Sequence, residues 1–239
     1  PDSLLHAHWE LYDIKTDFSQ NRDLAIRFPG KVKELDSLWW VEARKYQVLP
    51  LDGTAVDRLN VPRASFISPR DTFVYFQGSS LVKASVAAPT LNRSYRIKAE
   101  IEDMDKQVHG VLLAQAGSFG GWSFYILDNY LFFDYNWIGR EIYSIRSDRP
   151  LPVGDLVVEM DFVRNPGTDK GLGGEATLFV NGMVAGEGQI PHTNKNIYWP
   201  SSEGLTCGYD HLSPVSKSYR SPFRFTGNLE RVTVVVDPK

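Results

Sequence analysis

Residues 119–140 read FGGWSFYILDNYLFFDYNWIGR, in which two runs of aromatic and aliphatic residues flank Asp128 and Asn129. Short runs of this composition, bounded by turn residues, are typical of β-strands. A two-residue turn between paired strands requires positive φ angles, which Asn, Asp and Gly tolerate best. The stretch therefore predicts a β-hairpin with strands at residues 122–128 and 130–137.

The same pattern continues on both sides of this hairpin. Asn181 and Gly182 predict a second two-residue turn, whereas the glycine-rich residues 171–175 are expected to form a loop. Many antiparallel strands joined by tight turns predict a mainly β fold, a two-sheet β-sandwich. Its other strands are expected at residues 72–77, 94–102, 110–116, 140–146, 156–163, 175–182, 183–190 and 229–237.

The N-terminal part follows a different pattern. Trp9, Leu11 and Ile14 are spaced like a strand whose apolar side needs a sheet to lie on. Residues 29–46 predict an amphipathic helix. Its apolar stripe consists of Val32, Leu35, Leu38, Trp39, Ala43 and Tyr46.

These patterns divide the chain into three parts. The strand and helix occupy residues 1–50, a polar linker with Pro62 occupies residues 51–70, and the sandwich occupies residues 71–239. The lone strand implies a sheet whose other strands precede this sequence. In isolation the first part is therefore expected to display an apolar surface or to find a partner.

Composition narrows the classes of function. The 239 residues carry a formal charge of -3 and are 42% hydrophobic, so nothing favours binding to nucleic acid or to an anionic membrane. Every apolar run is far shorter than the roughly 18 residues of a membrane span. With the single cysteine Cys207, no internal disulfide forms. The first residues lack a secretion signal, and the sequence leaves a soluble cytoplasmic or periplasmic location equally open.

A glycosidase centre is one reading of the acidic residues 100–105, EIEDMD. Glu100, Glu102 and Asp105 resemble the paired acids of the laminarinase-like glycosidases, which are themselves β-sandwiches, although the key identities are exchanged. The alternative is ordinary strand alternation, in which Glu100 and Glu102 line the solvated face of a strand.

Other catalytic or metal sites find little support in the sequence. Cys207 has no basic neighbour that would lower its pKa, and a buried thiol is the alternative role. The five histidines lack the spacing of a zinc site. Asp210 offers one carboxylate, whereas calcium takes about six to eight oxygens. We therefore assign no catalytic residue and no metal ligand.

A sugar-binding surface is a further hypothesis. Aromatic rings stack on sugars while polar groups bond their hydroxyls. The alternative is that the aromatic side chains of one parity form the core. The candidate contacts are Trp122, Tyr125, Tyr135, Asn136, Trp137 and Arg140, with Asp134 nearby.

Several segments, in order, resemble the C-terminal region of the large bacterial arylsulfatases. They cover nearly the whole chain, from about Trp9 to Val236. The resemblance implies the end of the α/β sulfatase C-terminal subdomain followed by a jelly-roll sandwich of the concanavalin-A-like, laminin-G-like kind. The segments are WELYD (9–13), TDFSQNRDLA (16–25), KVKEL (31–35), EARKYQVLPLD (42–52), NRSYRIKAEIE (92–102), GVLLAQAGSFGGWSFYI (110–126), YNWIGRE (135–141), LGGEATLFVNGMVAGEGQIP (172–191), GYDHLSPVS (208–216) and FTGNLERVTVVV (225–236).

The resemblance also implies where the chemistry lies. These sulfatases use formylglycine, made in a C-x-[PS]-x-R motif, beside a calcium ion. Here the only candidate begins at Cys207, with Tyr209 and His211 at the third and fifth positions, so the nucleophile and the metal belong to a catalytic domain upstream. The residues expected to contact that domain are Trp9, Leu11, Leu35 and Trp39.

Three functions follow as hypotheses. The first is a noncatalytic C-terminal domain of an arylsulfatase, with a structural, accessory or substrate-access role. The second is an autonomous, lectin-like carbohydrate-binding module. The third is a laminarinase-like glycosidase. The expected partners are the sulfatase catalytic domain, a glycan or a second copy of the chain.

Overall fold

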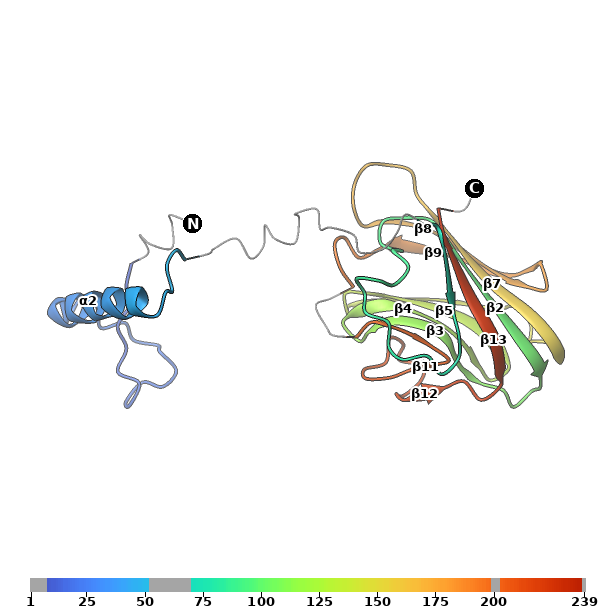
Figure 1. The fold of residues 1–239 in the computed structure, drawn as a ribbon, viewed down its shortest axis with the longest axis horizontal. Helices are drawn as coiled ribbons and strands as arrows, with labels where there is room; N and C mark the ends of the chain where they lie inside the picture. Colours follow the sequence, from blue (N-terminus) through green and yellow to red (C-terminus); the bar gives the residue numbers. More distant parts are fainter. Residues whose placement is uncertain (1–7, 52–69, 199–202, 238–239) are drawn as a thin grey trace. The chain divides into compact units, whose positions relative to one another are not determined.

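The computed structural model describes residues 8–51, 70–198 and 203–237. The chain divides into two compact units, Pro1–Pro62 and Arg63–Lys239, which we call the N-terminal unit and the sandwich. The boundary falls inside the predicted linker, most of which lies outside the described residues. Figure 1 shows one helix in the N-terminal unit and the strands in the sandwich.

The sandwich is a mainly β, antiparallel jelly roll with two large sheets, as predicted. A six-stranded sheet has the order β1-β13-β2-β7-β8-β9, a five-stranded sheet has the order β10-β3-β4-β5-β6, and β11 pairs with β12 (Figure 1). In chain order the strands are β1 (Thr72–Tyr75), β2 (Tyr95–Met104), β3 (Gly110–Gly117), β4 (Gly120–Leu127), β5 (Tyr130–Trp137), β6 (Glu141–Arg146), β7 (Gly154–Arg164), β8 (Leu172–Val180), β9 (Met183–His192), β10 (Leu205–Cys207), β11 (Tyr209–Asp210), β12 (Phe223–Arg224) and β13 (Asn228–Val236).

Both predicted tight turns are confirmed. Asp128 and Asn129 have φ angles of 50° and 63° between β4 and β5. Asn181 and Gly182 have φ angles of 49° and 77° between β8 and β9. Positive φ at both central residues matches the twist of the paired strands, so each dipeptide fixes the register of its hairpin.

The core lies between the two large sheets. In β2 the buried residues, from Tyr95 through Ile97 and Ala99 to Ile101, alternate with exposed or half-buried ones. The five-stranded sheet contributes large side chains such as Trp122. Each fully buried large apolar side chain stabilises the fold by about 1.5–3 kcal/mol relative to its exposed state.

Glycines bring the edges of the two sheets together on one side. An added Cβ at Gly186 would collide with the Arg146 carbonyl, and one at Gly188 would lie 2.6 Å from Ile145. The edge strand β9 therefore approaches the edge strand β6 closely, and we call this contact the glycine seam.

The prediction of a loop at residues 171–175 is wrong, because β8 begins at Leu172.

A segment covers the outer face of the five-stranded sheet. Residues 208–225, which we call the strap, include β11 and β12. Val215 and Tyr219 of the strap pack with Val111 and Tyr125 of the sheet. Any side chain at Gly110 would overlap the backbone of Arg224, so this glycine lets the strap lie close to β3. Both faces of the five-stranded sheet are thus largely buried.

The N-terminal unit contains the helix α2 (Pro29–Lys45), close to the predicted residues 29–46. Pro29 suits the first turn because its missing N–H has no intrahelical partner there. The predicted strand at residues 9–14 is not formed within the described part of this unit. Leu11 bonds there only to Asp23 and Leu24, because a strand needs a neighbouring strand to pair with.

Candidate functional site

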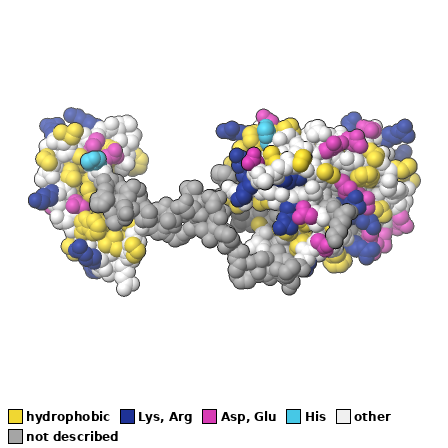
Figure 2. Space-filling model, turned by 90° about the horizontal axis from the view of Figure 1, so that it is seen from above, with side chains coloured by type: hydrophobic (Ala, Val, Ile, Leu, Met, Phe, Trp, Pro, Cys, Tyr) yellow, Lys and Arg dark blue, Asp and Glu magenta, His cyan; other side chains and the backbone are white. Residues whose placement is uncertain are grey.

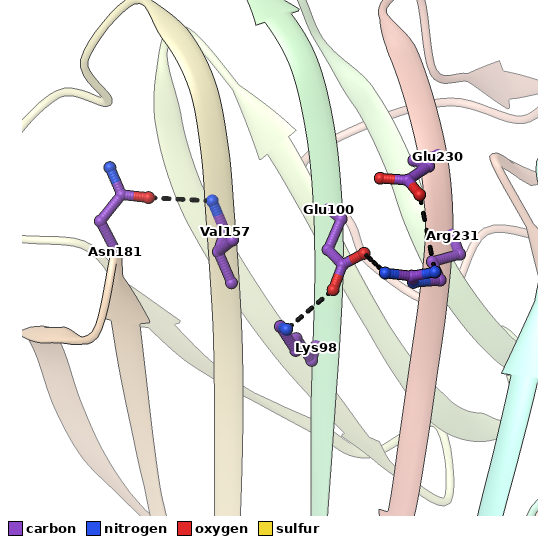
Figure 3. A network of polar contacts seen from close by, with 6 residues as sticks. All are labelled: Lys98, Glu100, Val157, Asn181, Glu230 and Arg231. Carbon is purple, nitrogen blue, oxygen red and sulfur yellow. Dashed lines mark hydrogen bonds and ion pairs between the residues drawn. The ribbon is translucent and has the colours of Figure 1, made fainter.

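Glu100 lies on the outer face of β2, where cations neutralise it. Lys98 Nζ lies 2.7 Å from one carboxylate oxygen and Arg231 lies 2.5 Å from the other (Figure 3). The hydrogen bond from Lys98, opposed by desolvation and aided by Arg231, lowers the pKa of Glu100. Both carboxylate oxygens of Glu100 are thus bound by cations of β2 and β13, which gives this side chain a structural role.

The other two candidate acids do not complete a catalytic pair with Glu100. Glu102 accepts a hydrogen bond from the Asn228 side chain. Asp105 follows the end of β2 and accepts the backbone N–H groups of Gln107 and Val108, at 2.6 Å and 3.1 Å. Glu100 and Glu102 thus connect β2 to the neighbouring strand β13, and Asp105 stabilises the turn after β2. This agrees with the alternative that Glu100 and Glu102 lie on the outer face of an ordinary strand.

Cys207 lies in β10 and is buried. Burial raises the pKa of its thiol to about 12, so the nucleophilic thiolate is scarce at neutral pH. Among the described residues no group of three or more His, Cys, Asp or Glu side chains could hold a metal ion. Tyr209 and His211 stand where the formylglycine motif requires Pro or Ser and Arg, so the described residues around Cys207 do not fit that group, and those searched offer no cluster for the sulfatase calcium.

Four of the six predicted sugar contacts are inaccessible in the sandwich. Trp122 and Tyr135 lie in the core between the sheets, and Tyr125 and Asn136 lie beneath the strap. All four are at most 2% exposed. Alternation along β4 and β5 was expected to bury one parity of side chains, but the strap buries the other parity as well.

Two of these buried side chains position the loops at one end of the sandwich. Asn136 Nδ2 donates to the carbonyls of Ser118 and Val215, and its Oδ1 accepts the Gly139 N–H. Tyr135 Oη accepts the Asn194 N–H at 2.9 Å. They hold in place the β3–β4 turn, the β5–β6 turn, the strap and the segment after β9.

The loops so held present an aromatic and charged cluster at the end of β5. The rings of Trp137 and His192 lie 4.8 Å apart at 34°, although the two residues belong to different sheets. Glu141 is paired with Trp137 across β5 and β6, and it accepts the Tyr143 hydroxyl at 2.8 Å. We call Trp137, Arg140, Glu141, Tyr143 and His192 the rim cluster.

The rim cluster is accessible and chemically mixed. Trp137 and Tyr143 are half-buried, whereas Arg140, Glu141 and His192 are exposed. Burial, with a contribution from Glu141, raises the pKa of Tyr143 to about 12, so its hydroxyl stays protonated and can donate. The cluster combines stacking surfaces with donors and an acceptor.

Two apolar side chains and an unpartnered amide accompany the rim cluster. Phe119 is 60% exposed and Ile138 is 39% exposed, and an added Cβ at Gly139 would lie 3.1 Å from the Ser118 carbonyl, so their two turns are neighbours. Asn194, two residues after His192, is buried, and its side-chain amide finds no hydrogen-bond partner. Buried polar atoms normally have partners.

Sequence reasoning named only Trp137 and Arg140 of the rim cluster. His192 comes from β9, more than 50 positions along the chain, as the numbering shows. No short motif links it to Trp137. Glu141 and Tyr143 lie just beyond the aromatic stretch, and their period-two spacing was the available signal for a shared face.

A buried polar network lies beneath the strap. Asp210 accepts the Tyr219 hydroxyl at 2.6 Å and the backbone N–H groups of Val215 and His211. Burial is the main cause that raises the pKa of Asp210. Every oxygen of this carboxylate is thus used to shape the strap, which gives Asp210 a structural role.

The N-terminal unit has a separate candidate surface. A hollow of about 220 Å³ is lined by all four residues expected to contact a catalytic domain, Trp9, Leu11, Leu35 and Trp39. Along α2 only Ala43 is buried. Figure 2 shows hydrophobic side chains gathered on the visible face of this unit. Among the described residues, no helix combines the length and apolar character needed to cross a bilayer.

Comparison with known proteins assigns the chain to no family. No protein-family model and no curated protein matches the chain. Ruminococcus gnavus IT-sialidase CBM40, solved bound to α2,3-sialyllactose, is similar over 70% of this chain and 90% of its own, with 13% identity and a TM-score of 0.44.

Two further solved structures are similar to parts of this chain. Domains LG4-5 of the mouse laminin α1 chain match over 68% of this chain and 41% of theirs, at 15% identity and a TM-score of 0.43. The botulinum neurotoxin type G receptor-binding domain matches over 60% and 33%, at 11% identity and a TM-score of 0.36. These comparisons give the arylsulfatase resemblance no support.

Proposed function

We propose that the sandwich is a noncatalytic carbohydrate-binding module and that the rim cluster is its ligand site. The observation that carries this proposal is the contact between Trp137 and His192, 4.8 Å apart, with the exposed Arg140 donating its backbone N–H to the Trp137 carbonyl. Elsewhere among the described residues, the aromatic side chains of β4 and the acids of β2 are committed to the core or to neighbouring strands.

The chemistry of the cluster suits a saccharide. An aromatic face stacks on the C–H face of a sugar ring, while charged and hydroxyl groups bond its hydroxyls. Trp137 supplies the face and Arg140 supplies donors. Glu141 and the Tyr143 hydroxyl oxygen, whose proton is donated to Glu141, supply acceptors.

A glycan array with the full chain, followed by calorimetric titration of the strongest ligand, tests the proposal. α2,3-Sialyllactose is included because it is the ligand of the Ruminococcus gnavus domain. We expect Trp137→Ala to weaken binding about tenfold or more, since losing one aromatic contact and its buried area costs about 1.4 kcal/mol or more.

Trp9→Ala is the matched control, because it removes a half-exposed tryptophan from the N-terminal unit. It should leave the affinity unchanged. An array without any bound glycan, or a Trp137→Ala variant that binds as tightly as the parent, would contradict the proposal.

We also propose, as a second function, that the N-terminal unit docks on a catalytic domain of the arylsulfatase kind, which carries the formylglycine and calcium. It is favoured by one observation: Trp9, Leu11, Leu35 and Trp39 line a single hollow. This chain itself should not hydrolyse p-nitrophenyl sulfate in the presence of calcium.

Extending the reading frame before residue 1 tests the second proposal directly. We expect an upstream domain containing C-x-[PS]-x-R. A reading frame that starts near residue 1, or hydrolysis of p-nitrophenyl sulfate by the purified chain, would overturn it.

A further inference from the structure

One buried side chain, Asn136, joins the strap to the turn that carries the rim cluster. Its Nδ2 donates to the Val215 carbonyl of the strap at 3.0 Å and to the Ser118 carbonyl of the β3–β4 turn at 3.1 Å. Its Oδ1 accepts the Gly139 N–H of the β5–β6 turn at 2.8 Å. Asn136 is only 2% exposed, so the loss of any of these partners would leave a buried polar atom unsatisfied.

A second contact of the strap lies beside the first. Ser213 of the strap accepts the Ser118 N–H at 3.0 Å, and Ser118 is also the close neighbour of Gly139. The strap and the two turns therefore meet at one place. We call Ser118, Asn136, Gly139, Ser213 and Val215 the strap junction.

The shape of the β5–β6 turn depends on the strap junction. Ile138 and Gly139 have φ angles of 47° and 73°, and a positive φ is unfavourable for a β-branched residue such as isoleucine. The bond from Gly139 to Asn136 helps to hold this conformation. Trp137 begins the turn, and Arg140 closes it by donating its N–H to the Trp137 carbonyl at 3.0 Å. A change at the junction would therefore move residues of the rim cluster.

The strap is tied at its ends, and its middle rests on the sheet. Gly208 donates its N–H to the Leu112 carbonyl of β3 at 3.0 Å, and Phe225 donates to the Gly208 carbonyl at 2.9 Å. A loop whose ends are joined in this way can open at its middle while its ends stay in place. The middle packs through Val215, whose N–H is held by Asp210.

From these contacts we infer that the strap regulates the glycan site, with Asn136 as the positioning residue that couples the two. In the closed state, the Val215 carbonyl holds Asn136, and Asn136 holds the β5–β6 turn. When the strap opens, Asn136 loses this partner, and the turn no longer fixes Trp137 beside His192. A glycan that contacts both rings binds the closed state better. It therefore keeps the strap closed, and strap opening weakens glycan binding, because coupling between two sites is reciprocal.

This inference rests on the proposed glycan site and deepens it, because it names what controls the affinity of that site. The coupling between strap and turn can be measured without any glycan. A coupled turn on a chain that binds no glycan would contradict the proposed function, and the regulation with it. A glycan bound by a turn that is not coupled to the strap would contradict the inference alone.

Amide hydrogen exchange of the full chain, followed by NMR, tests the coupling without a ligand. The reporter is the Arg140 N–H, which is bonded within the turn. Asp210→Asn disturbs the strap about Val215 and should speed exchange at Arg140 by about threefold or more. The control amide is that of Asn181 in the β8–β9 turn, whose partner lies on β7. Its exchange should not change, which separates a local effect from a general loss of stability.

Asn136→Leu should remove the coupling, because an apolar side chain of similar size bonds neither the strap nor the turn. In this background Asp210→Asn should no longer speed exchange at Arg140, as expected when one residue carries the interaction between two others. Asn165→Leu, the same change at an exposed position, should leave the coupling intact.

Ser213→Ala provides a milder variant should Asn136→Leu fail to fold. It removes only the strap hydroxyl that accepts the Ser118 N–H. We expect exchange at Arg140 to rise by about twofold.

The second part of the test adds α2,3-sialyllactose or, when another glycan of the array binds more tightly, that glycan. In the parent, a saturating concentration should slow exchange at the Val215 N–H by about threefold or more. Asp210→Asn should weaken glycan binding by about fivefold or more in calorimetric titration. Both effects should be absent in the Asn136→Leu background.

Three results would overturn the inference. The first is unchanged exchange at Arg140 in Asp210→Asn. The second is an equal effect of Asp210→Asn in the parent and in Asn136→Leu, because Asn136 would then not carry the coupling. The third is a glycan that binds the parent and Asp210→Asn with the same affinity.

Discussion

The two units bury their large apolar side chains to very different extents. In the sandwich, Trp122 is fully buried between two sheets, and the strap covers the outer face of the five-stranded sheet. In the N-terminal unit, Trp9 is 50% exposed and Leu38 on α2 is 53% exposed. The same residue types thus form a closed core in one unit and an open apolar layer in the other, and an open layer of this kind is what the proposed docking requires.

The largest expected effect comes from opening the closed core. Trp122→Ala should lower the free energy of unfolding of the sandwich by about 3–5 kcal/mol, because it removes a large buried side chain and leaves a cavity. Urea denaturation followed by circular dichroism measures this. Trp9→Ala is the comparison in the open unit, and an equal loss there would break the contrast between the units.

A smaller loss is expected when the strap is loosened. Asp210→Asn should cost about 1–3 kcal/mol, since the new amide donor would face groups that themselves donate, Tyr219 and Val215. Trypsin should also cut faster after the exposed Lys217. Asp169→Asn, an exposed control, should change neither quantity, and an Asp210→Asn strap that resists trypsin like the parent would show that the cover does not depend on this carboxylate.

The stability of the sandwich should depend on pH through Asp134, which is buried beneath the strap. Burial raises its pKa above the ordinary value of 3.8. A carboxyl whose pKa is raised on folding adds stability that is fully present below its unfolded pKa and is lost as pH rises through its folded pKa.

Asp134→Asn removes this titration while an oxygen remains to accept the Tyr125 hydroxyl. The stability of the parent relative to the variant should therefore fall between about pH 4 and about pH 7. Urea denaturation at both pH values measures the difference, and a difference that grows with pH would contradict the prediction.

The smallest change in stability is expected for a substitution in the exposed apolar surface of the N-terminal unit. Leu38→Ser should change the free energy of unfolding of the full chain by less than about 0.5 kcal/mol, because the Leu38 side chain is 53% exposed and buries little apolar area. Helix content and thermal unfolding by circular dichroism measure it. Ala43→Asp, at the single buried position of α2, should reduce helix content, and a large loss for Leu38→Ser would mean that the layer is already covered.

Most of the sandwich follows from local patterns. Turn dipeptides such as Asn181 and Gly182 correctly predicted the hairpins. Alternation along β2 correctly distinguished its buried residues from Glu100. The strands β10, β11 and β12 were missed because each spans only two or three residues. No periodicity can be read over so short a length.

The candidate site was harder to predict from the sequence. Alternation shows which side chains share a face of a strand. It does not show that a segment about Val215, 90 positions further along the chain, covers the second face over Tyr125. The partner of Trp137 likewise comes from the other sheet. Whether residues 9–12 become a strand depends on a pairing strand, and no single segment specifies that.

The glycine seam has a mechanical consequence for ligand binding. Because β6 and β9 approach each other there, Trp137 from one sheet and His192 from the other meet near its end. A ligand held by both rings would tie the two sheets together and resist their sliding under load. The force needed to unfold the bound sandwich in an optical trap should then exceed that of the free one, so a bound glycan would make the module more resistant to pulling.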